Sequence, residues 1–291
     1  MPPGDPRPTA KPLPSGLYFL ATPIGAARDI TLRALDILAV ADVLAAEDTR
    51  TLRHLMEIHA VALGGRPLIA YHDHNGAAVR PRLLAALAEG KTVAYASEAG
   101  TPLVADPGYQ LGRAAIAAGI PVHAAPGPSA VLAALTVSGL PSDRFLFAGF
   151  PPATQGARKT FLAGLASVPA TLILFESPRR IQRLLTEMCQ SHGSERQGVV
   201  CRELTKRFEE VTRGSLADLA ETFAGREVKG EIVLLVDRAV AEAASGDDLD
   251  AALGKALEGM TVKDAVAQVA TDLGLPRAQV YKAALAKGKD T

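Results

Sequence analysis

Short apolar runs alternate with helical patterns along the first half of the chain. Runs typical of buried strands stand at residues 17–20, 42–46, 68–71, 92–96 and 121–125. Apolar residues at three- and four-residue spacing predict helices at residues 29–38, 49–58, 79–89 and 109–118, and a further helix that opens at residue 130. This alternation predicts a mostly parallel α/β sheet, which binds its ligands at the carboxyl ends of the strands.

The second half mixes strands and helices less regularly. An apolar run ends in the double proline at residues 151–152, which indicates a domain junction. Further strands are predicted at residues 171–175, 198–201 and 231–236, and helices at residues 179–189 and 216–223.

Both ends of the chain differ in composition from its body. Prolines crowd the first 14 residues without an apolar stretch, which is typical of a disordered leader and not of a signal peptide. Two amphipathic helices are predicted within residues 247–288, either as a helix-turn-helix element or as a packing appendage. We therefore divide the chain into a leader (1–15), an N-terminal α/β domain (16–142), a second α/β domain (143–238), a linker (239–250) and a C-terminal helical domain (251–291).

Composition narrows the class of protein. The 291 residues are 48% hydrophobic and 21% charged, as in soluble globular proteins. The formal net charge is zero, because the chain has 31 basic residues (Lys and Arg) and 31 acidic residues (Asp and Glu). Nucleic acid would therefore have to be bound by a local basic face. No apolar run of about 18 residues predicts a membrane span. Cys189 and Cys201 match no disulfide or zinc pattern, which favours a reducing, cytoplasmic setting.

Three breaker-rich turns follow predicted strands, at residues 21–25, 97–108 and 126–130. None has the spacing of a dinucleotide or phosphate loop. Glycines let a ligand approach the backbone closely, and a long loop rich in Gly and Pro is usually functional. Turns at the carboxyl ends of strands in one parallel sheet are expected to converge on one crevice.

Polar clusters stand beside several of the strands, at residues 47–50, 71–75, 202–206 and 228–231. His72 and His74 flank Asp73, but no Cys or helically spaced carboxylate accompanies them, so the pattern does not favour a metal site. A substrate-contact surface, a hydrogen-bonded turn and a solvated face all remain open for these clusters. No nucleophile elbow is present. Pattern and spacing therefore lead to an α/β enzyme with a crevice, and they do not name its ligand.

The motifs in these turns and clusters resemble a known family. They read ATPIG at residue 21, EDTR at 47, YHDHN at 71, AGTP at 99, DPG at 106, PGPSA at 126, SGLP at 138, FESP at 175, RELTK at 202 and KGE at 229. In order and spacing they are similar to the tetrapyrrole methylase superfamily, in particular its branch that methylates small-subunit ribosomal RNA. The resemblance spans residues 16–238, and the tail resembles the C-terminal helical domain of that branch.

The resemblance implies two α/β domains of the tetrapyrrole methylase type with S-adenosylmethionine in the cleft between them, in a homodimer. It implies 2′-O-methylation of a cytidine ribose in the decoding region of 16S rRNA. The residues expected at the cofactor are Pro23, Gly100, Thr101, Pro102, Ser129, Ala130, Phe150, Phe175, Glu176, Leu204, Glu231 and Ile232. The chain departs from the family pattern at Ala26–Ala27 and at Glu98, where the family has Asn-Leu and Asp.

A ribose hydroxyl is a weak nucleophile near neutral pH, so a base should assist its deprotonation. Asp48, His72 and Glu203 are the candidates for this role. Phosphates could be held by Arg50, Arg202 and Lys206, within a local basic face that would also include Arg158, Lys159, Arg179, Arg180 and Arg207.

Two other functions are compatible with the sequence. One is a small-molecule methylase that acts on a tetrapyrrole, against which the EDTR and YHDHN motifs and the helical tail argue. The other is a non-catalytic RNA-binding protein that has kept the fold. Such a protein has no need of the glycine- and proline-rich turns expected at the cofactor.

Overall fold

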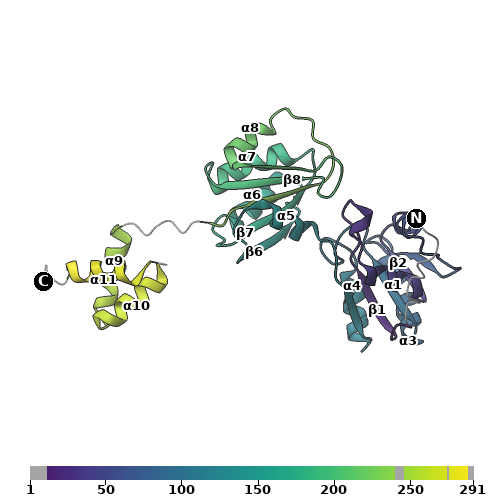
Figure 1. Cartoon of the computed structure of the whole chain (residues 1–291). Coiled ribbons are helices and arrows are strands. Elements are labelled where there is room, and N and C mark those ends of the chain that lie inside the picture. The colour runs from purple at the N-terminus through teal and green to yellow at the C-terminus, as the bar shows by residue number, and fades with distance from the viewer. Residues whose placement is uncertain (1–11, 240–245, 274, 288–291) are drawn as a thin grey trace, which may run out of the picture.

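The computed structural model describes residues 12–239, 246–273 and 275–287. It contains two five-stranded sheets and a separate group of helices. Figure 1 shows the two α/β units next to each other and the last three helices apart from both. Within the described ranges, no helix is long and apolar enough to cross a bilayer.

The first sheet is entirely parallel, as the alternation of strands and helices predicted. Its strands lie in the order β3-β2-β4-β1-β5. Their bounds are Gly16–Leu20 (β1), Val43–Ala46 (β2), Leu68–Ala70 (β3), Thr92–Ala96 (β4) and Val122–Ala125 (β5). Every residue of β1, β2 and β4 is buried, which explains why these strands read as continuous apolar runs.

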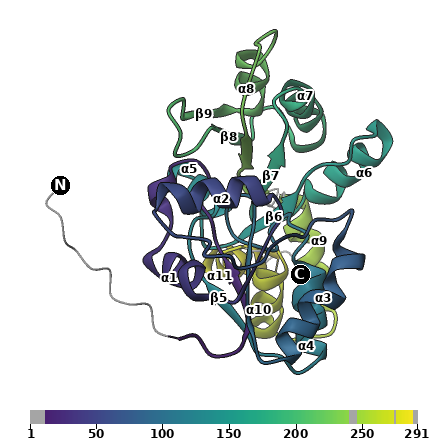
Figure 2. The ribbon, with the colours of Figure 1, turned by 90° about the vertical axis from the view of Figure 1, so that its right-hand side faces the viewer.

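Helices cover both faces of this sheet. They are the 3₁₀ turn η1 (Ala27–Asp29), α1 (Leu32–Val40), α2 (Thr49–Ile58), α3 (Gly76–Ala88) and α4 (Tyr109–Ala117). Figure 2 shows α1 and α2 on one side and α3 and α4 on the other. A separate apolar cluster lies under each pair. The cap of α1 is Thr31, whose side chain accepts a hydrogen bond from the backbone N–H of Ala34.

The second sheet is mixed and has the order β6-β7-β10-β8-β9. Its strands are Phe145–Gly149 (β6), Thr171–Glu176 (β7), Gln197–Arg202 (β8), Glu210–Ser215 (β9) and Ile232–Val236 (β10). Only the β6–β7 pair is parallel. The helices of this unit are Gln155–Leu165 (α6), Ile181–His192 (α7) and Leu216–Thr222 (α8), which share one apolar cluster with the sheet.

Helix α5 (Ala130–Ser138) joins the two units. It was expected with the N-terminal domain, yet its buried Val131 and Ala134 pack against Ile173 and Leu235 of the second sheet. The same cluster includes Ile24 from the loop after β1. The two sheets are therefore coupled through α5 and through that loop.

Two elements were missed because they carry little apolar signal. Helix α6 buries only two side chains, those of Arg158 and Leu162. Strand β9 lies at the edge of the sheet, and Ser215 is its only fully buried residue. An edge strand that is half exposed lacks the apolar run by which the other strands were found.

The two ends of the chain also differ from the expectations. Leu13, placed in the predicted leader, packs against the first sheet's apolar cluster, while residues 1–11 lie outside the described residues. Helix α9 (Gly246–Leu257) begins inside the predicted linker, so the linker was drawn too long. The composition of residues 239–250 was interpreted as that of a linker, but acidic residues such as Asp248 are also favourable in the first turn of a helix.

In residues 246–273 and 275–287 the tail contains three helices, not the two that were predicted. Helix α9 packs with α10 (Val262–Asp272) and α11 (Arg277–Lys287) around a small apolar core. Leu253 and Val280, both fully buried, contribute to that core.

Candidate active site

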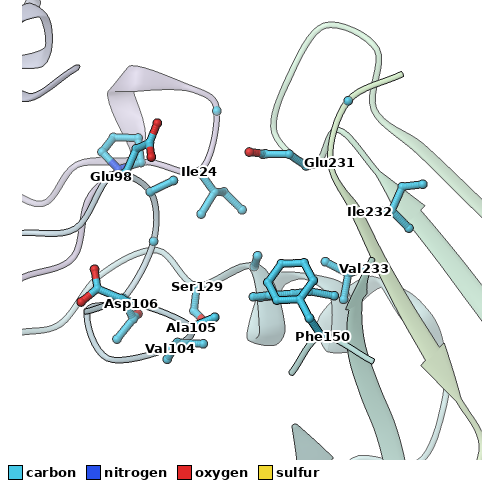
Figure 3. Close-up of a pocket in the computed structure, with 18 of the residues that line it drawn as sticks. Ile24, Glu98, Val104, Ala105, Asp106, Ser129, Phe150, Glu231, Ile232 and Val233 are labelled. Carbon is cyan, nitrogen blue, oxygen red and sulfur yellow. The ribbon is translucent and has the colours of Figure 1, made fainter. Parts of the chain in front are cut away.

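A pocket of about 670 Å³ lies between the two α/β units, within the range of roughly 300–1,000 Å³ that is common for ligand sites. Its first wall consists of the loops after β1, β2, β4 and β5, and its second wall of β7, β10 and the segments beside them. Figure 3 shows Ile24, Glu98 and Asp106 on one side and Glu231, Ile232 and Val233 on the other, with Phe150 between them.

Hydrogen bonds bring the three breaker-rich turns together at the first wall. The backbone N–H groups of Thr22 and Gly100 each donate to the other residue's carbonyl, both at 3.0 Å. Thr101 donates its hydroxyl to the carbonyl of Pro128 at 2.9 Å. Gly100 has a φ of +80°, a left-handed conformation that favours glycine. The turns after β1, β4 and β5 therefore form one rigid surface, as their positions after parallel strands predicted.

The second wall carries a buried carboxylate with one free oxygen. One oxygen of Glu176 accepts hydrogen bonds from the backbone N–H of Ser177 at 2.7 Å and from Nε of Arg180 at 2.6 Å. The other oxygen, Oε2, is buried and has no hydrogen-bond partner among the described residues. A buried oxygen without a partner is costly unless a ligand supplies a donor.

Two loops hold the walls together at the edge of the pocket. The hydroxyl of Thr205 accepts a hydrogen bond from the backbone N–H of Ala26 at 3.0 Å. Lys206 donates to Glu203 at 2.8 Å and to Glu231 at 2.9 Å, so it joins two segments of the second unit. A Cβ at Gly25 would overlap the side chains of Lys206 and Thr205, so this contact between the units requires glycine.

Three acidic side chains, those of Glu47, Glu98 and Asp106, lie along the first wall. Burial raises the pKa of Glu47, and the neighbouring charges of Asp106 and Glu98 raise it further. Burial also raises the pKa of Asp106, although its carboxylate accepts hydrogen bonds from the hydroxyl of Tyr95 at 3.0 Å and from the N–H of Gly108 at 2.8 Å. This wall is therefore strongly acidic.

The pocket gathers most of the residues expected at a cofactor. Of that set, the residues that line it are Pro23, Gly100, Thr101, Ser129, Ala130, Phe150, Phe175, Glu176, Glu231 and Ile232. Pro102 and Leu204 are buried next to it and do not line it. Leu204 instead packs in the apolar cluster under α5.

The three base candidates lie outside the lining of the pocket. Asp48 caps α2, and its hydrogen bonds with the Arg50 side chain and backbone lower its pKa to about 2. Glu203 accepts hydrogen bonds from Lys206 and from the backbone N–H of Glu231, and the bond to Lys206 is the main cause of its lowered pKa. His72 is half-buried, and its Nδ1 has no hydrogen-bond partner among the described residues.

The candidates for RNA contact differ in their surroundings. Arg50 has a side chain that is 91% exposed, and Lys206 lines the pocket. Arg202 is held by Glu210 at 2.9 Å. The remaining basic residues that stay exposed are Lys159, Arg179 and Arg207, whereas Arg180 pairs with Glu176.

Arg158 was expected on the basic face, and this prediction is wrong. Its side chain is 2% exposed and forms a two-pronged ion pair with Glu187, in which NH2 donates at 2.7 Å. The two residues are 29 positions apart, so no local pattern in the sequence could reveal the pair.

Several lining residues were not singled out by sequence reasoning, among them Glu47, Asp106 and Val233. The first two stand inside a cluster and a loop that the sequence had marked, at residues 47–50 and 97–108. The marked segments therefore contribute to the lining of the pocket, and which residue of each segment does so could be read only from the structure. In the described parts of the chain, no group of three or more His, Cys, Asp or Glu could hold a metal ion.

Residues 16–220 match the family model described as tetrapyrrole (corrin/porphyrin) methylases, which is more than half of the chain. The chain belongs to the tetrapyrrole methylase family. A second model, the RsmI C-terminal HTH domain, matches residues 238–288 of this methylase.

Curated relatives of this methylase are similar over nearly their whole length. A ribosomal RNA small subunit methyltransferase I of Mesorhizobium japonicum is 49% identical over 283 residues, which cover 97% of this chain and 95% of that protein. A protein of the same name from Mycobacterium tuberculosis strain H37Rv is 43% identical and covers 95% of this chain and 97% of its own.

Solved structures of methylases share the fold at low identity. A cobalt precorrin-4 methyltransferase of cobalamin biosynthesis is 20% identical, with a TM-score of 0.59 over 76% of this chain and 94% of that chain. A uroporphyrin-III C-methyltransferase from Thermus thermophilus, solved with S-adenosyl homocysteine, is also 20% identical, with a TM-score of 0.53 over 76% of this chain and 97% of that chain.

Proposed function

We propose that this methylase transfers a methyl group from S-adenosylmethionine to a cytidine ribose 2′-hydroxyl in the decoding region of 16S rRNA. The observation that carries the proposal is the near full-length similarity, at 43–49% identity, to proteins named ribosomal RNA small subunit methyltransferase I. The match of residues 238–288 to the C-terminal domain of the same proteins favours this branch over tetrapyrrole enzymes.

The residues of the pocket fit S-adenosylmethionine. The unpartnered Oε2 of Glu176 offers an acceptor to a ligand amine or hydroxyl. Gly100 and Ser129 present small residues at the first wall, and Phe150 and Ile232 present apolar surface at the second. When bound, the cofactor supplies an electrophilic methyl group on a positively charged sulfur, which suits a wall that carries several carboxylates.

The protein then has to position the acceptor and exclude water. The Thr22–Gly100 bonds and the Thr101–Pro128 bond fix the first wall. Phe150 lies against Phe175, with ring centroids 5.5 Å apart, and forms an apolar surface beside the pocket. We expect Pro102 and Leu204, which are buried and do not line the pocket, to pack behind the residues that do.

RNA binding is proposed for the mouth of the pocket and its surroundings. Arg50 stands at the start of α2 beside the acidic wall, and Lys206 lies at the opposite side. We expect both to contact phosphates, together with Arg202 and the exposed basic residues of the second unit. The proposed substrate implies a cytoplasmic reaction.

A homodimer is part of the proposal. Phe145 and Leu146, on strand β6 at the edge of the second sheet, are 44% and 37% exposed. Exposed apolar side chains on an open strand edge favour contact with a second copy.

The test is transfer of labelled methyl from S-adenosylmethionine to three acceptors: isolated small ribosomal subunits, naked rRNA and a tetrapyrrole. We expect label on the rRNA as 2′-O-methylcytidine, which nuclease digestion and mass spectrometry identify. Label on the tetrapyrrole alone would refute the proposal. Cofactor binding without transfer to any acceptor would favour the non-catalytic RNA-binding protein.

A further inference from the structure

The geometry points to Glu47 as the catalytic residue that accepts the proton of the ribose hydroxyl. This inference rests on the proposed function and deepens it, because it assigns the base that the reaction requires. Glu47 comes directly after β2 and directly before Asp48, the cap of α2. It lines the pocket together with Thr51, one turn further along α2.

The other carboxylates near the pocket already have fixed partners. Asp48 is bound by the Arg50 side chain and by two backbone N–H groups. Glu203 and Glu231 share Lys206, and Glu176 holds Arg180. A carboxylate that is stabilised by a cation is a weak proton acceptor, because the cation favours its ionised form.

Asp106 is also committed, since it accepts hydrogen bonds from the Tyr95 hydroxyl and from the N–H groups of Gly108 and Leu103. These bonds hold the loop after β4. Glu98 stands on the same loop and is exposed to solvent. Glu47 and Asp106 are both half-buried, but only Asp106 is bonded to another side chain, that of Tyr95. The carboxylate of Glu47 has no salt bridge among those found in the described residues.

The groups that face Glu47 make it more basic. Its surroundings contain Glu98 and Asp106 from the loop after β4 and Asp73 from the loop after β3, all of which repel a negative charge. Burial acts in the same direction and is the largest cause of its raised pKa, while the backbone of Glu98 opposes it with a hydrogen bond. A carboxylate whose pKa is moved toward neutrality takes a proton from an alcohol more readily and is still ionised at neutral pH.

The transfer step then balances. The ribose oxygen forms a bond to the methyl carbon as the bond from that carbon to sulfur breaks, and the electron pair stays on sulfur. The hydroxyl proton moves to the carboxylate of Glu47, which later releases it to water. The cationic cofactor and the neutral alcohol thus give a neutral thioether, a methyl ether and one proton, and no metal or further reactant enters this balance.

The test compares Glu47→Gln with Glu57→Gln, which removes an exposed carboxylate from the far end of α2, the helix that begins after Glu47. Single-turnover transfer to small subunits is measured from about pH 5 to pH 9, with cofactor in excess. We expect Glu47→Gln to be about 10²- to 10⁴-fold slower, the usual effect of losing a general base. The wild-type rate should rise tenfold per pH unit below the pKa of Glu47 and level off above it, and Glu47→Gln should lose this rise.

Two further measurements do not depend on turnover. Calorimetry with S-adenosylhomocysteine should give equal affinities for the wild type, Glu47→Gln and Glu57→Gln, which also shows that the variants fold. Carbon-13 NMR of the free protein should show one Glu carboxyl that titrates above the ordinary value of about 4.3 and disappears in Glu47→Gln. Glu47→Asp should recover part of the rate, because it keeps the carboxylate.

A rate for Glu47→Gln within threefold of the wild type, with the same pH profile, would overturn the assignment. An affinity that falls in proportion to the rate would make Glu47 a binding residue and overturn it as well. If the wild type transfers no label to rRNA, the proposed function fails together with this assignment. Transfer by the wild type and by Glu47→Gln alike removes the assignment alone.

Discussion

The buried ion pair between Arg158 and Glu187 offers a sharp test of how the second unit supports the pocket. Arg158 donates two hydrogen bonds to Glu187, and its NH1 donates to the carbonyls of Pro152 at 3.1 Å and Ala153 at 2.8 Å. Those carbonyls belong to the segment that follows Phe150. One guanidinium thus connects α6, α7 and the chain beside the pocket.

Replacing Arg158 by Met leaves the carboxylate of Glu187 buried without its partner. Hydrogen bonds between charged groups contribute about 1.5–3 kcal/mol each, and removal of one member of a buried pair costs about 3–5 kcal/mol. Because the two side chains are only 2% and 8% exposed, we expect the upper half of that range. The double variant Arg158→Met, Glu187→Leu should recover most of the loss, since it leaves no buried charge.

The contribution of Glu187 to stability should depend on pH in opposite directions in the wild type and in Arg158→Met. In the wild type the hydrogen bonds from Arg158 lower the pKa of Glu187, so its contribution to stability is complete above about pH 4.3 and is lost as the pH falls through the folded value. In Arg158→Met the hydrogen bonds are lost and burial becomes the largest remaining cause, so we expect it to raise that pKa against the smaller opposing effects of Arg183 and Lys159. The variant should therefore be least destabilised below about pH 4.3, and more destabilised as the pH rises through the raised folded value.

Hydrogen exchange of α6 and α7, read by mass spectrometry, measures the local free energy of opening in a chain of several domains. Lys159→Met is the matched control, because it removes an exposed cation from the next position of the same helix, and it should change that energy by no more than about 0.5 kcal/mol. A loss below 1 kcal/mol for Arg158→Met, or a double variant as unstable as the single one, would refute this reasoning.

Three further predictions concern the pocket and the second unit. Gly25→Ala should weaken S-adenosylhomocysteine binding about tenfold or more by calorimetry, because its Cβ would overlap Lys206, whereas Gly164→Ala, with open space around it and no left-handed φ, should not. Glu176→Gln should reduce the same affinity about tenfold, since it replaces a charged acceptor, and an unchanged affinity would remove Glu176 from the cofactor site. Ser215→Ala breaks a capping box, so it should lower the local free energy of opening of α8 by about 1 kcal/mol, as measured by hydrogen exchange. The affinity for the cofactor should not change.

The first sheet could be predicted from the sequence because of how its strands are buried. Strands β1, β2 and β4 have both faces covered by helices, so their residues are continuously apolar and stand out from the polar turns. Strand β9 has the opposite situation: it lies at a sheet edge, and residues such as Arg213 and Glu210 face neighbours that only the fold brings close. An apolar run in the sequence therefore predicts a strand that is buried on both faces. It does not predict a strand whose polar side chains are partnered by residues distant in the sequence.

The candidate site shows the same division. Glycine- and proline-rich turns mark the loops of a parallel sheet, and these loops form the pocket. Within the EDTR motif, however, the sequence cannot tell which of two adjacent acids lines the pocket. The structure separates them: Asp48 turns toward the backbone of α2 as its cap, and Glu47 lines the pocket. The turn from strand to helix decides this, and it is not encoded in the spacing of the motif.

The structure partly explains the equal numbers of basic and acidic residues, because several of them form ion pairs with each other. The structure places Arg158, Arg180 and Arg202 in ion pairs with Glu187, Glu176 and Glu210, so these three basic side chains have carboxylate partners within the second unit. Of the basic face expected from the sequence, Lys159, Arg179 and Arg207 remain exposed to solvent, and each phosphate contact adds close to one unit to the salt dependence of RNA binding. Recognition of the ribosomal subunit by this methylase should therefore depend mainly on the shape of the RNA and on a nucleotide that enters the pocket.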